Sequence, residues 1–192
     1  FAVGCAPAQK PLTDYVNPML RTATLWDSVD LGFKPTKRTW GAEVFPGSAL
    51  PNAMVQVSPV TKFHSGAGYQ YEDSVIYGFT HTNKGHWNLC HIPLLPVTGT
   101  PTPGDYCSPF SHERESAAPG YYQVFLDRYG VDAQLSSTLR CAFHKYTYPA
   151  GAAASLLADL QRSNEHVRAW DIRKEGDNVF AGWQQTGEKM YF

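Results

Sequence analysis

Short apolar segments separated by turns fill the C-terminal part of the 192-residue chain, and this pattern constrains the fold most strongly. Six segments follow one another: residues 121–127, 131–138, 139–148, 152–159, 167–173 and 178–184. In residues 131–138 apolar and polar side chains alternate, which places the two kinds on opposite faces of a strand. Parallel strands would need long crossover connections, usually helical, whereas only turns separate these segments. The pattern therefore predicts an all-β fold, an antiparallel β-sandwich.

The first 120 residues are richer in loops. Residues 52–58 alternate as a strand does, and residues 75–79 and 92–97 are shorter candidates. The chain contains 16 Gly and 14 Pro, and no stretch keeps a helical period for long, which excludes a helical bundle. A further strand is expected to start at Lys189, after a turn at Gly187 and Glu188. Because a finished domain rarely ends on an unpaired apolar strand, we expect the sandwich, residues 14–192, to be incomplete at its C-terminal end.

Composition excludes several classes of protein. Hydrophobic residues make up 43% of the chain and charged residues only 17%, so intrinsic disorder is not expected. Sixteen Lys and Arg against 17 Asp and Glu give a formal net charge of −1, which argues against binding of nucleic acid or an anionic membrane surface. The aromatic content of 14% fits strand packing, and it also fits exposed rings that contact a neutral ligand rich in hydroxyl groups.

The N-terminal residues 1–13 form a separate segment. Ala2-Val3-Gly4-Cys5 resembles the lipobox of bacterial lipoproteins, in which the cysteine carries the lipid, and a proline-rich stretch follows as an extended tether. This interpretation makes Cys5 the lipid attachment site and predicts a periplasmic or outer-membrane lipoprotein of the bacterial cell envelope. Contact with the membrane would be through the anchor alone. The alternative is an ordinary cysteine near a chain end.

The remaining cysteines and the histidines give no metal site. Cys90, Cys107 and Cys141 contain no C-x-x-C pair, so either one disulfide such as Cys90–Cys107 or free buried thiols is expected. Three histidines follow one another at intervals of five, a spacing that suits neither one helix face nor one strand face: His81, His86 and His91. We therefore predict no metal ligands. The carboxylates show no spacing that identifies a catalytic pair either, so we predict no catalytic residue.

One loop points to a ligand. Residues 78–89 place Trp87 among neutral hydrogen-bonding groups, with His86 and Asn88 on either side of it. An indole can cover the apolar C–H face of a sugar, while imidazole and amide groups bond to its hydroxyls without leaving an unpaired charge in a dry pocket. The alternative is a buried tryptophan beside turn-forming residues.

The order of several motifs resembles the N-terminal domain of glycoside hydrolase family 92. These motifs include Asp14-Tyr15-Val16-Asn17-Pro18, Phe45-Pro46-Gly47, Gly78-Phe79-Thr80-His81-Thr82 and Pro119-Gly120-Tyr121-Tyr122. The resemblance runs from about Asp14 to the last residue. It implies a calcium-dependent, inverting exo-α-mannosidase in which this β-sandwich precedes a C-terminal (α/α)6 barrel, absent here, with the active site between them.

The resemblance also assigns roles. In the family, the catalytic acid, the base and the Ca²⁺ ligands lie on the barrel, so this part alone is expected to be inactive and to supply only loops of the pocket for a mannose-containing glycan. The His86-Trp87-Asn88 loop resembles that of members acting on α-1,2-linked mannose, where the tryptophan lines the subsite for the leaving sugar. Phe45 and Gly47 belong to a neighbouring substrate-binding loop. Arg21 departs from the family, which has glycine there. The alternatives are a non-catalytic glycan-binding β-sandwich of a surface lipoprotein and a domain with no sugar contact.

Overall fold

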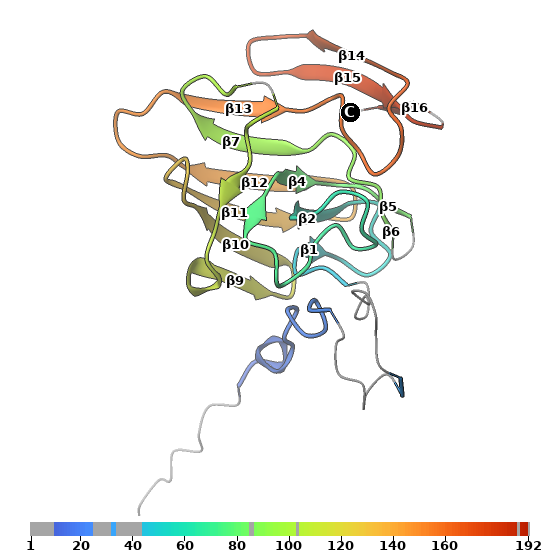
Figure 1. Ribbon diagram of the computed structural model, residues 1–192, viewed down its shortest axis with the longest axis vertical. Helices are drawn as coiled ribbons and strands as arrows, with labels where there is room; N and C mark the ends of the chain where they lie inside the picture. The colour runs from blue at the N-terminus through green and yellow to red at the C-terminus, as the bar shows by residue number, and fades with distance from the viewer. Residues whose placement is uncertain are drawn as a thin grey trace, which may run out of the picture.

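The computed structural model describes residues 10–24, 32–33, 44–84, 87–102, 104–187 and 189–191. In this part of the chain nearly all regular structure is strand, arranged in antiparallel sheets, which confirms the predicted all-β class (Figure 1). The only helical elements described are the 3-10 turns η1 (Leu12–Tyr15) and η2 (His112–Arg114). Neither of these described turns has the length or apolar character needed to cross a membrane.

One layer of the sandwich is a four-stranded sheet in the order β12-β11-β10-β9. Its strands are β9 (Glu115–Ala118), β10 (Tyr121–Leu126), β11 (Val131–Ser137) and β12 (Ala142–Thr147). Tyr122 pairs with Leu135, and Leu126 with Val131. Every second side chain of β10 and β11 is buried, as the alternation of the sequence predicts.

The other layer is a five-stranded antiparallel sheet in the order β1-β2-β4-β7-β13. Its strands are β1 (Ser48–Ala49), β2 (Gln56–Val60), β4 (Gly78–Thr80), β7 (Leu94–Thr98) and β13 (Ala154–Ala158). Val57, Phe79 and Leu95 from this sheet form one core with the buried face of β10 and β11. Burial of such side chains contributes roughly 1.5–3 kcal/mol each.

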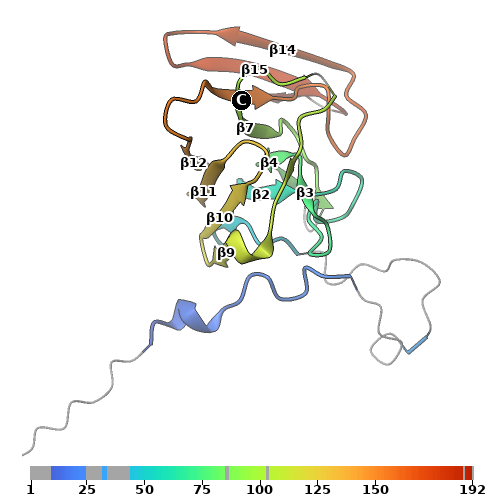
Figure 2. The ribbon, with the colours of Figure 1, turned by 60° about the vertical axis from the view of Figure 1, so that its left-hand side comes forward.

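Three smaller groups of strands complete the structure. β14 (Ala169–Lys174), β15 (Phe180–Gln185) and β16 (Lys189–Tyr191) form a meander. Both ribbon views place β14 and β15 beside β13 at one end of the sandwich (Figures 1 and 2). β3 (Val75–Ile76) pairs with β8 (Ser108–Pro109), and β5 (Asn83–Lys84) pairs with β6 (Trp87–Asn88).

A buried carboxylate fixes the loops between the layers. The side chain of Glu115 is 1% exposed, and it accepts hydrogen bonds from the hydroxyls of Tyr69 (2.9 Å) and Tyr122 (2.6 Å). His112 contacts Glu115 through Nδ1 at 2.5 Å and the carbonyl oxygen of Tyr71 through Nε2 at 2.7 Å. Both ring nitrogens of His112 therefore lie within hydrogen-bonding distance of an oxygen atom. Burial and the Glu115 charge raise the pKa of Tyr69 well above its usual value, which keeps this hydroxyl a donor.

The structure corrects three details of the sequence predictions. The strand expected over 52–58 begins only at Gln56, because Asn52 has a left-handed φ of 58° in the turn that precedes it. Residues 75–79 form two strands, since β3 pairs with β8 whereas β4 pairs with β2 and β7. The strand expected over 139–148 begins at Ala142, after a turn closed by the Thr138 amide and the Cys141 carbonyl at 2.8 Å.

The cysteines are free thiols, but only Cys90 is buried as that alternative expected, whereas Cys107 is partly exposed and Cys141 is exposed. Cys90, Cys107 and Cys141 are all unpaired, so the Cys90–Cys107 disulfide is not formed. Cys90 is completely buried, and burial raises the pKa of its thiol to about 12. This thiol is therefore protonated at physiological pH and packs as a small apolar side chain.

Candidate functional site

The predicted tryptophan loop is the β5–β6 hairpin. Lys84 pairs with Trp87, and Asn83 pairs with Asn88. Trp87 is partly exposed, so its side chain belongs neither to the fully buried core nor to the freely exposed surface. His86 lies outside the described residues, as does Cys5. The structure therefore shows the base of the loop and the position of the tryptophan, and Trp87 is not the deeply buried residue of the alternative interpretation.

Asn88 belongs to the hairpin, but its side chain is buried in the protein and not on the surface. Its side chain is completely buried, and its Oδ1 accepts hydrogen bonds from the Cys90 amide at 2.7 Å and the Thr80 hydroxyl at 3.3 Å. Its Nδ2 donates to the Ala67 carbonyl at 3.3 Å. All polar atoms of this amide are thus used within the protein. This placement differs from the direct sugar contact expected from the sequence, because a buried amide must satisfy its own hydrogen-bonding groups first.

Asn164 is a second support of the hairpin. Its Nδ2 donates to the Asn88 carbonyl at 2.6 Å, and its backbone amide donates to the Leu89 carbonyl at 3.0 Å. Its Oδ1 accepts from the His64 amide at 2.6 Å. The side chain of Asn164 therefore bonds to backbone groups of Asn88 and His64, which lie 76 and 100 positions before it in the sequence. Sequence reasoning missed Asn164, since no local motif marks a residue whose partners are all distant.

The Phe45–Gly47 segment leads into β1, an edge strand of the five-stranded sheet. Phe45 is partly buried. A Cβ atom added to Gly47 would lie 2.0 Å from the carbonyl oxygen of Val57 on β2. Glycine is therefore required at this position by the close approach of two backbones, independently of any ligand. β2 pairs with β4, and β4 leads directly to the β5–β6 hairpin, so one sheet carries both predicted segments.

A histidine pair adjoins the hairpin. Nε2 of His81 lies 2.8 Å from Nε2 of His144, whose Nδ1 lies 2.6 Å from the Tyr146 hydroxyl. One imidazole must donate and the other accept, so the two rings cannot both be protonated. Burial lowers the pKa of His81 to about 4, and burial followed by the repulsion from His81 lowers the pKa of His144 to about 3.

No metal site is visible among the residues that the structure describes, where no three His, Cys, Asp or Glu side chains converge. His91 is separated from the His81–His144 pair and lies near Glu165 and Thr186. Ca²⁺ prefers six to eight oxygen ligands, with Asp and Glu carboxylates common among them, and the described residues show no cluster of three such side chains. The family resemblance places the Ca²⁺ ligands on the barrel and not on this chain.

Comparison with known proteins agrees with this architecture. Residues 15–192 match the Glycosyl hydrolase family 92 N-terminal domain. The structure resembles that of a family GH92 alpha-mannosidase from Bacteroides thetaiotaomicron, with a TM-score of 0.78 and 28% sequence identity over 92% of this chain and 24% of that one. The same alpha-mannosidase in complex with mannoimidazole gives a TM-score of 0.77 over 91% of this chain and 23% of that one.

A family GH92 inverting mannosidase from Bacteroides thetaiotaomicron is also similar, with a TM-score of 0.71 and 25% identity over 91% of this chain and 23% of that one. A search of curated proteins finds no match. The fold and the sequence match together define the N-terminal β-sandwich domain of a glycoside hydrolase. The chain belongs to glycosyl hydrolase family 92. It spans about a quarter of the length of the solved relatives.

Proposed function

We propose that this chain forms one wall of the substrate pocket of an exo-α-mannosidase that removes mannose from mannose-containing glycans, with a preference for α-1,2 linkages. Three observations support the proposal: membership of family 92, the mannosidase relatives of similar structure, and the position of Trp87. The main observation is that Trp87 is partly exposed on a hairpin in which the next residue, Asn88, is completely buried.

The rigid base of the hairpin suits sugar stacking. Asn88 and Asn164 hold β6 and the residues after it through side-chain bonds to backbone groups, so little conformational entropy of this strand remains to be lost when a ligand binds. Apolar burial contributes about 25 cal/mol per Å², so covering roughly 55 Å² of indole contributes about 1.4 kcal/mol, or tenfold in affinity. We assign Trp87 the contact with the leaving sugar and Asn88 a positioning role beneath it. His86 and the Phe45–Gly47 loop are proposed as neighbouring contacts.

The bond-breaking groups are proposed to lie in a part of the enzyme beyond this chain. Inversion requires an acid that protonates the leaving oxygen and a base that activates water on the opposite face of the sugar. Ca²⁺, bound by that other part, would polarise the sugar or the attacking water. The residues described here bind and orient the glycan, and their contribution is to the recognition of the sugar on the far side of the scissile bond.

The test compares two substrates of the complete encoded protein. Trp87→Ala is expected to lower kcat/KM for α-1,2-mannobiose by about tenfold, as estimated above. An aryl α-mannoside, whose leaving group is not a sugar, should lose less than threefold. Trp87→Phe keeps an aromatic face and should recover part of the loss on mannobiose. Equal losses on both substrates would contradict the assignment, as would an absence of mannose release by the unaltered protein.

The cellular location is a separate part of the proposal. We propose attachment to the bacterial envelope through a lipid on Cys5. Metabolic labelling with a palmitate analogue should label the unaltered protein and leave Cys5→Ala unlabelled. Labelling of both proteins, or of neither, would contradict an anchor at this residue.

A further inference from the structure

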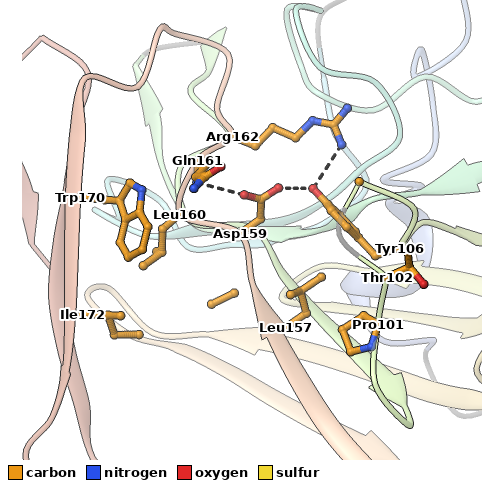
Figure 3. A pocket seen from close by; sticks show the side chains of 12 residues that line it. Pro101, Thr102, Tyr106, Leu157, Asp159, Leu160, Gln161, Arg162, Trp170 and Ile172 are labelled. Carbon is orange, nitrogen blue, oxygen red and sulfur yellow. Dashed lines mark hydrogen bonds between the residues drawn. The ribbon is translucent and has the colours of Figure 1, made fainter.

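A pocket of about 670 Å³ lies between the end of β13, the 101–106 loop and β14. Figure 3 shows Trp170 and Leu160 on one side of it, Tyr106 and Pro101 on the opposite side, and Asp159 between them. Its volume falls within the range of small-molecule binding sites. The β5–β6 hairpin contributes no residue to its lining, so this pocket is distinct from the Trp87 site.

Trp170 provides an apolar face to the pocket. It lies on β14, and 42% of its surface is exposed. Ile172 lies on the same side of the space as Trp170, and Leu157 lies on the other side, near Pro101 (Figure 3). An indole left in water forgoes part of its burial free energy, so Trp170 has apolar surface that a ligand in the pocket could cover.

Opposite the indole, three polar side chains form a chain of hydrogen bonds. The Tyr106 hydroxyl donates to Oδ2 of Asp159 and accepts from the Arg162 guanidinium at 3.2 Å. Oδ1 of Asp159 accepts a hydrogen bond from the backbone amide of Gln161 at 3.0 Å. Burial and the bond to Asp159 raise the pKa of Tyr106 to about 12, so the phenol stays protonated. An ionised carboxylate can accept about four hydrogen bonds, and protein groups occupy only two of these positions.

Aromatic rings hold Arg162 in place. Its guanidinium carbon lies 4.5 Å from the centre of the Phe63 ring and 5.0 Å from that of Tyr77. These cation–π contacts orient the planar group while leaving most of its five N–H donors uncommitted. The positive charge of Arg162 and the negative charge of Asp159 meet at the same hydroxyl, so the polar side of the pocket carries little net charge.

These features select a ligand with an apolar ring face and a rim of uncharged donors and acceptors. An anion would be repelled by Asp159 and a cation by Arg162, whereas a hydroxyl group can accept from the guanidinium and donate to the carboxylate at once. We propose that this pocket is a second carbohydrate-binding site, in which a pyranose ring of a neutral oligosaccharide stacks on Trp170 and bonds through its hydroxyls to Asp159 and Arg162.

The pocket shares one segment with the Trp87 hairpin. Asp159 and Arg162 bond to Tyr106 in the pocket, and Asn164, two residues further along, bonds to the Asn88 carbonyl. A single stretch of chain therefore lines the pocket and also bonds to the Trp87 hairpin. A branched glycan held at the second site would remain attached to the enzyme between cleavage events, which raises its effective concentration at the Trp87 site. This role rests on the proposed function, whereas the binding site itself does not.

The test measures binding without cleavage in the complete encoded protein. The probe is S-linked α-1,2-mannobiose, a thioglycoside that resists hydrolysis, titrated by isothermal calorimetry. A Trp87→Ala background weakens the first site, and binding that persists in this background is assigned to the second. Adding Trp170→Ala should weaken the persisting binding at least tenfold, and Trp170→Phe should restore part of it. The melting temperature of each variant reports whether the protein is folded.

Each outcome decides the proposal. Persisting binding that depends on Trp170 supports the site. No binding in the Trp87→Ala protein overturns it, as does persisting binding that is unchanged by both Trp170 substitutions. The fluorescence of Trp170 is obtained as the difference between the unaltered protein and Trp170→Phe. If an aqueous quencher does not reduce this fluorescence, polypeptide fills the pocket, and the proposal is overturned as well. Hydrolysis of ordinary α-1,2-mannobiose tests the proposed function separately, so either proposal can fail while the other stands.

Discussion

Replacing Asn88 by alanine tests whether the hairpin is held as the structure indicates. The substitution removes three side-chain hydrogen bonds, to Thr80, Cys90 and Ala67. It also leaves the Cys90 amide and the Ala67 carbonyl without these partners, and both residues are buried. At about 1 kcal/mol for each hydrogen bond, we expect a loss of about 3 kcal/mol in the free energy of unfolding. For a chain of this size the melting temperature falls by roughly 6–12 °C.

Asn83 provides a matched control on the paired strand. Its Nδ2 and Oδ1 are buried without a hydrogen-bond partner, although it lies directly opposite Asn88. Asn83→Ala removes the same atoms and no hydrogen bond. We therefore expect a change of less than about 0.5 kcal/mol, or a small gain, because removing an unsatisfied buried amide is favourable.

The assay combines thermal unfolding with hydrogen exchange of the segment from Asn83 to Ile92. Asn88→Ala should speed exchange of the Cys90 amide by about 100-fold or more, which is the rate equivalent of about 3 kcal/mol of local opening. Asn83→Ala should leave this exchange nearly unchanged. If both variants behave alike, the hydrogen bonds of Asn88 do not hold the hairpin, and the argument that Trp87 is preorganised is wrong.

Three further substitutions test other parts of the structure. Gly47→Ala should destabilise the protein by several kcal/mol, because its Cβ would lie 2.0 Å from the Val57 oxygen, and thermal unfolding measures the loss. Arg21→Gly should raise the unfolding free energy by about 1 kcal/mol, since Arg21 has a left-handed φ of 64°. His144→Phe should weaken the acid destabilisation seen between about pH 6.5 and pH 4 in urea titrations. The lowered pKa values of His81 and His144 mean that the unfolded chain binds protons first, so their contribution to stability is complete above about pH 6.5 and is lost as the pH falls through about 4 and 3.

Each of these predictions has its own control. Gly187→Ala should cost little, because nothing lies within 4 Å of a Cβ added there. Arg21→Ala should give no gain, since it keeps the Cβ that disfavours the left-handed conformation. The neutral His81–His144 pair would be contradicted if acidification lowers the unfolding free energy of His144→Phe as steeply as that of the unaltered protein.

Alternation made most of the C-terminal strands predictable. In β10 and β11 each buried residue is followed by a more exposed one, and the sequence shows the same period directly. The predicted strand boundaries are wrong where the backbone conformation of a single residue determines where a strand begins. A left-handed Asn52 cuts the strand expected over 52–58, and nothing in an apolar–polar alternation reports the φ angle of one residue.

The site was less predictable because its important contacts are long-range. The sequence places Trp87 and Asn88 side by side, and the alternation of a strand sends these neighbours to opposite faces, one partly exposed and one buried. Asn164 and Arg162 carry no local signal at all, since each acts on residues from distant segments. Residue type alone could not separate an amide that contacts a ligand from one that supports the loop beneath it.

Arg21 departs from its family at a position where the backbone conformation suits glycine. The resemblance to family 92 places glycine here, and Arg21 has a left-handed φ of 64°, which glycine adopts readily. The surrounding turn is closed by the Thr22 amide and hydroxyl, both of which donate to the Met19 carbonyl, at 3.2 and 2.9 Å. The Thr22 carbonyl in turn accepts from the Tyr71 amide at 3.2 Å. The path of the loop is therefore fixed by these bonds. The side chain of Arg21 is exposed, so we expect any effect of Arg21 on a sugar to come from this side chain on the outer surface of the loop.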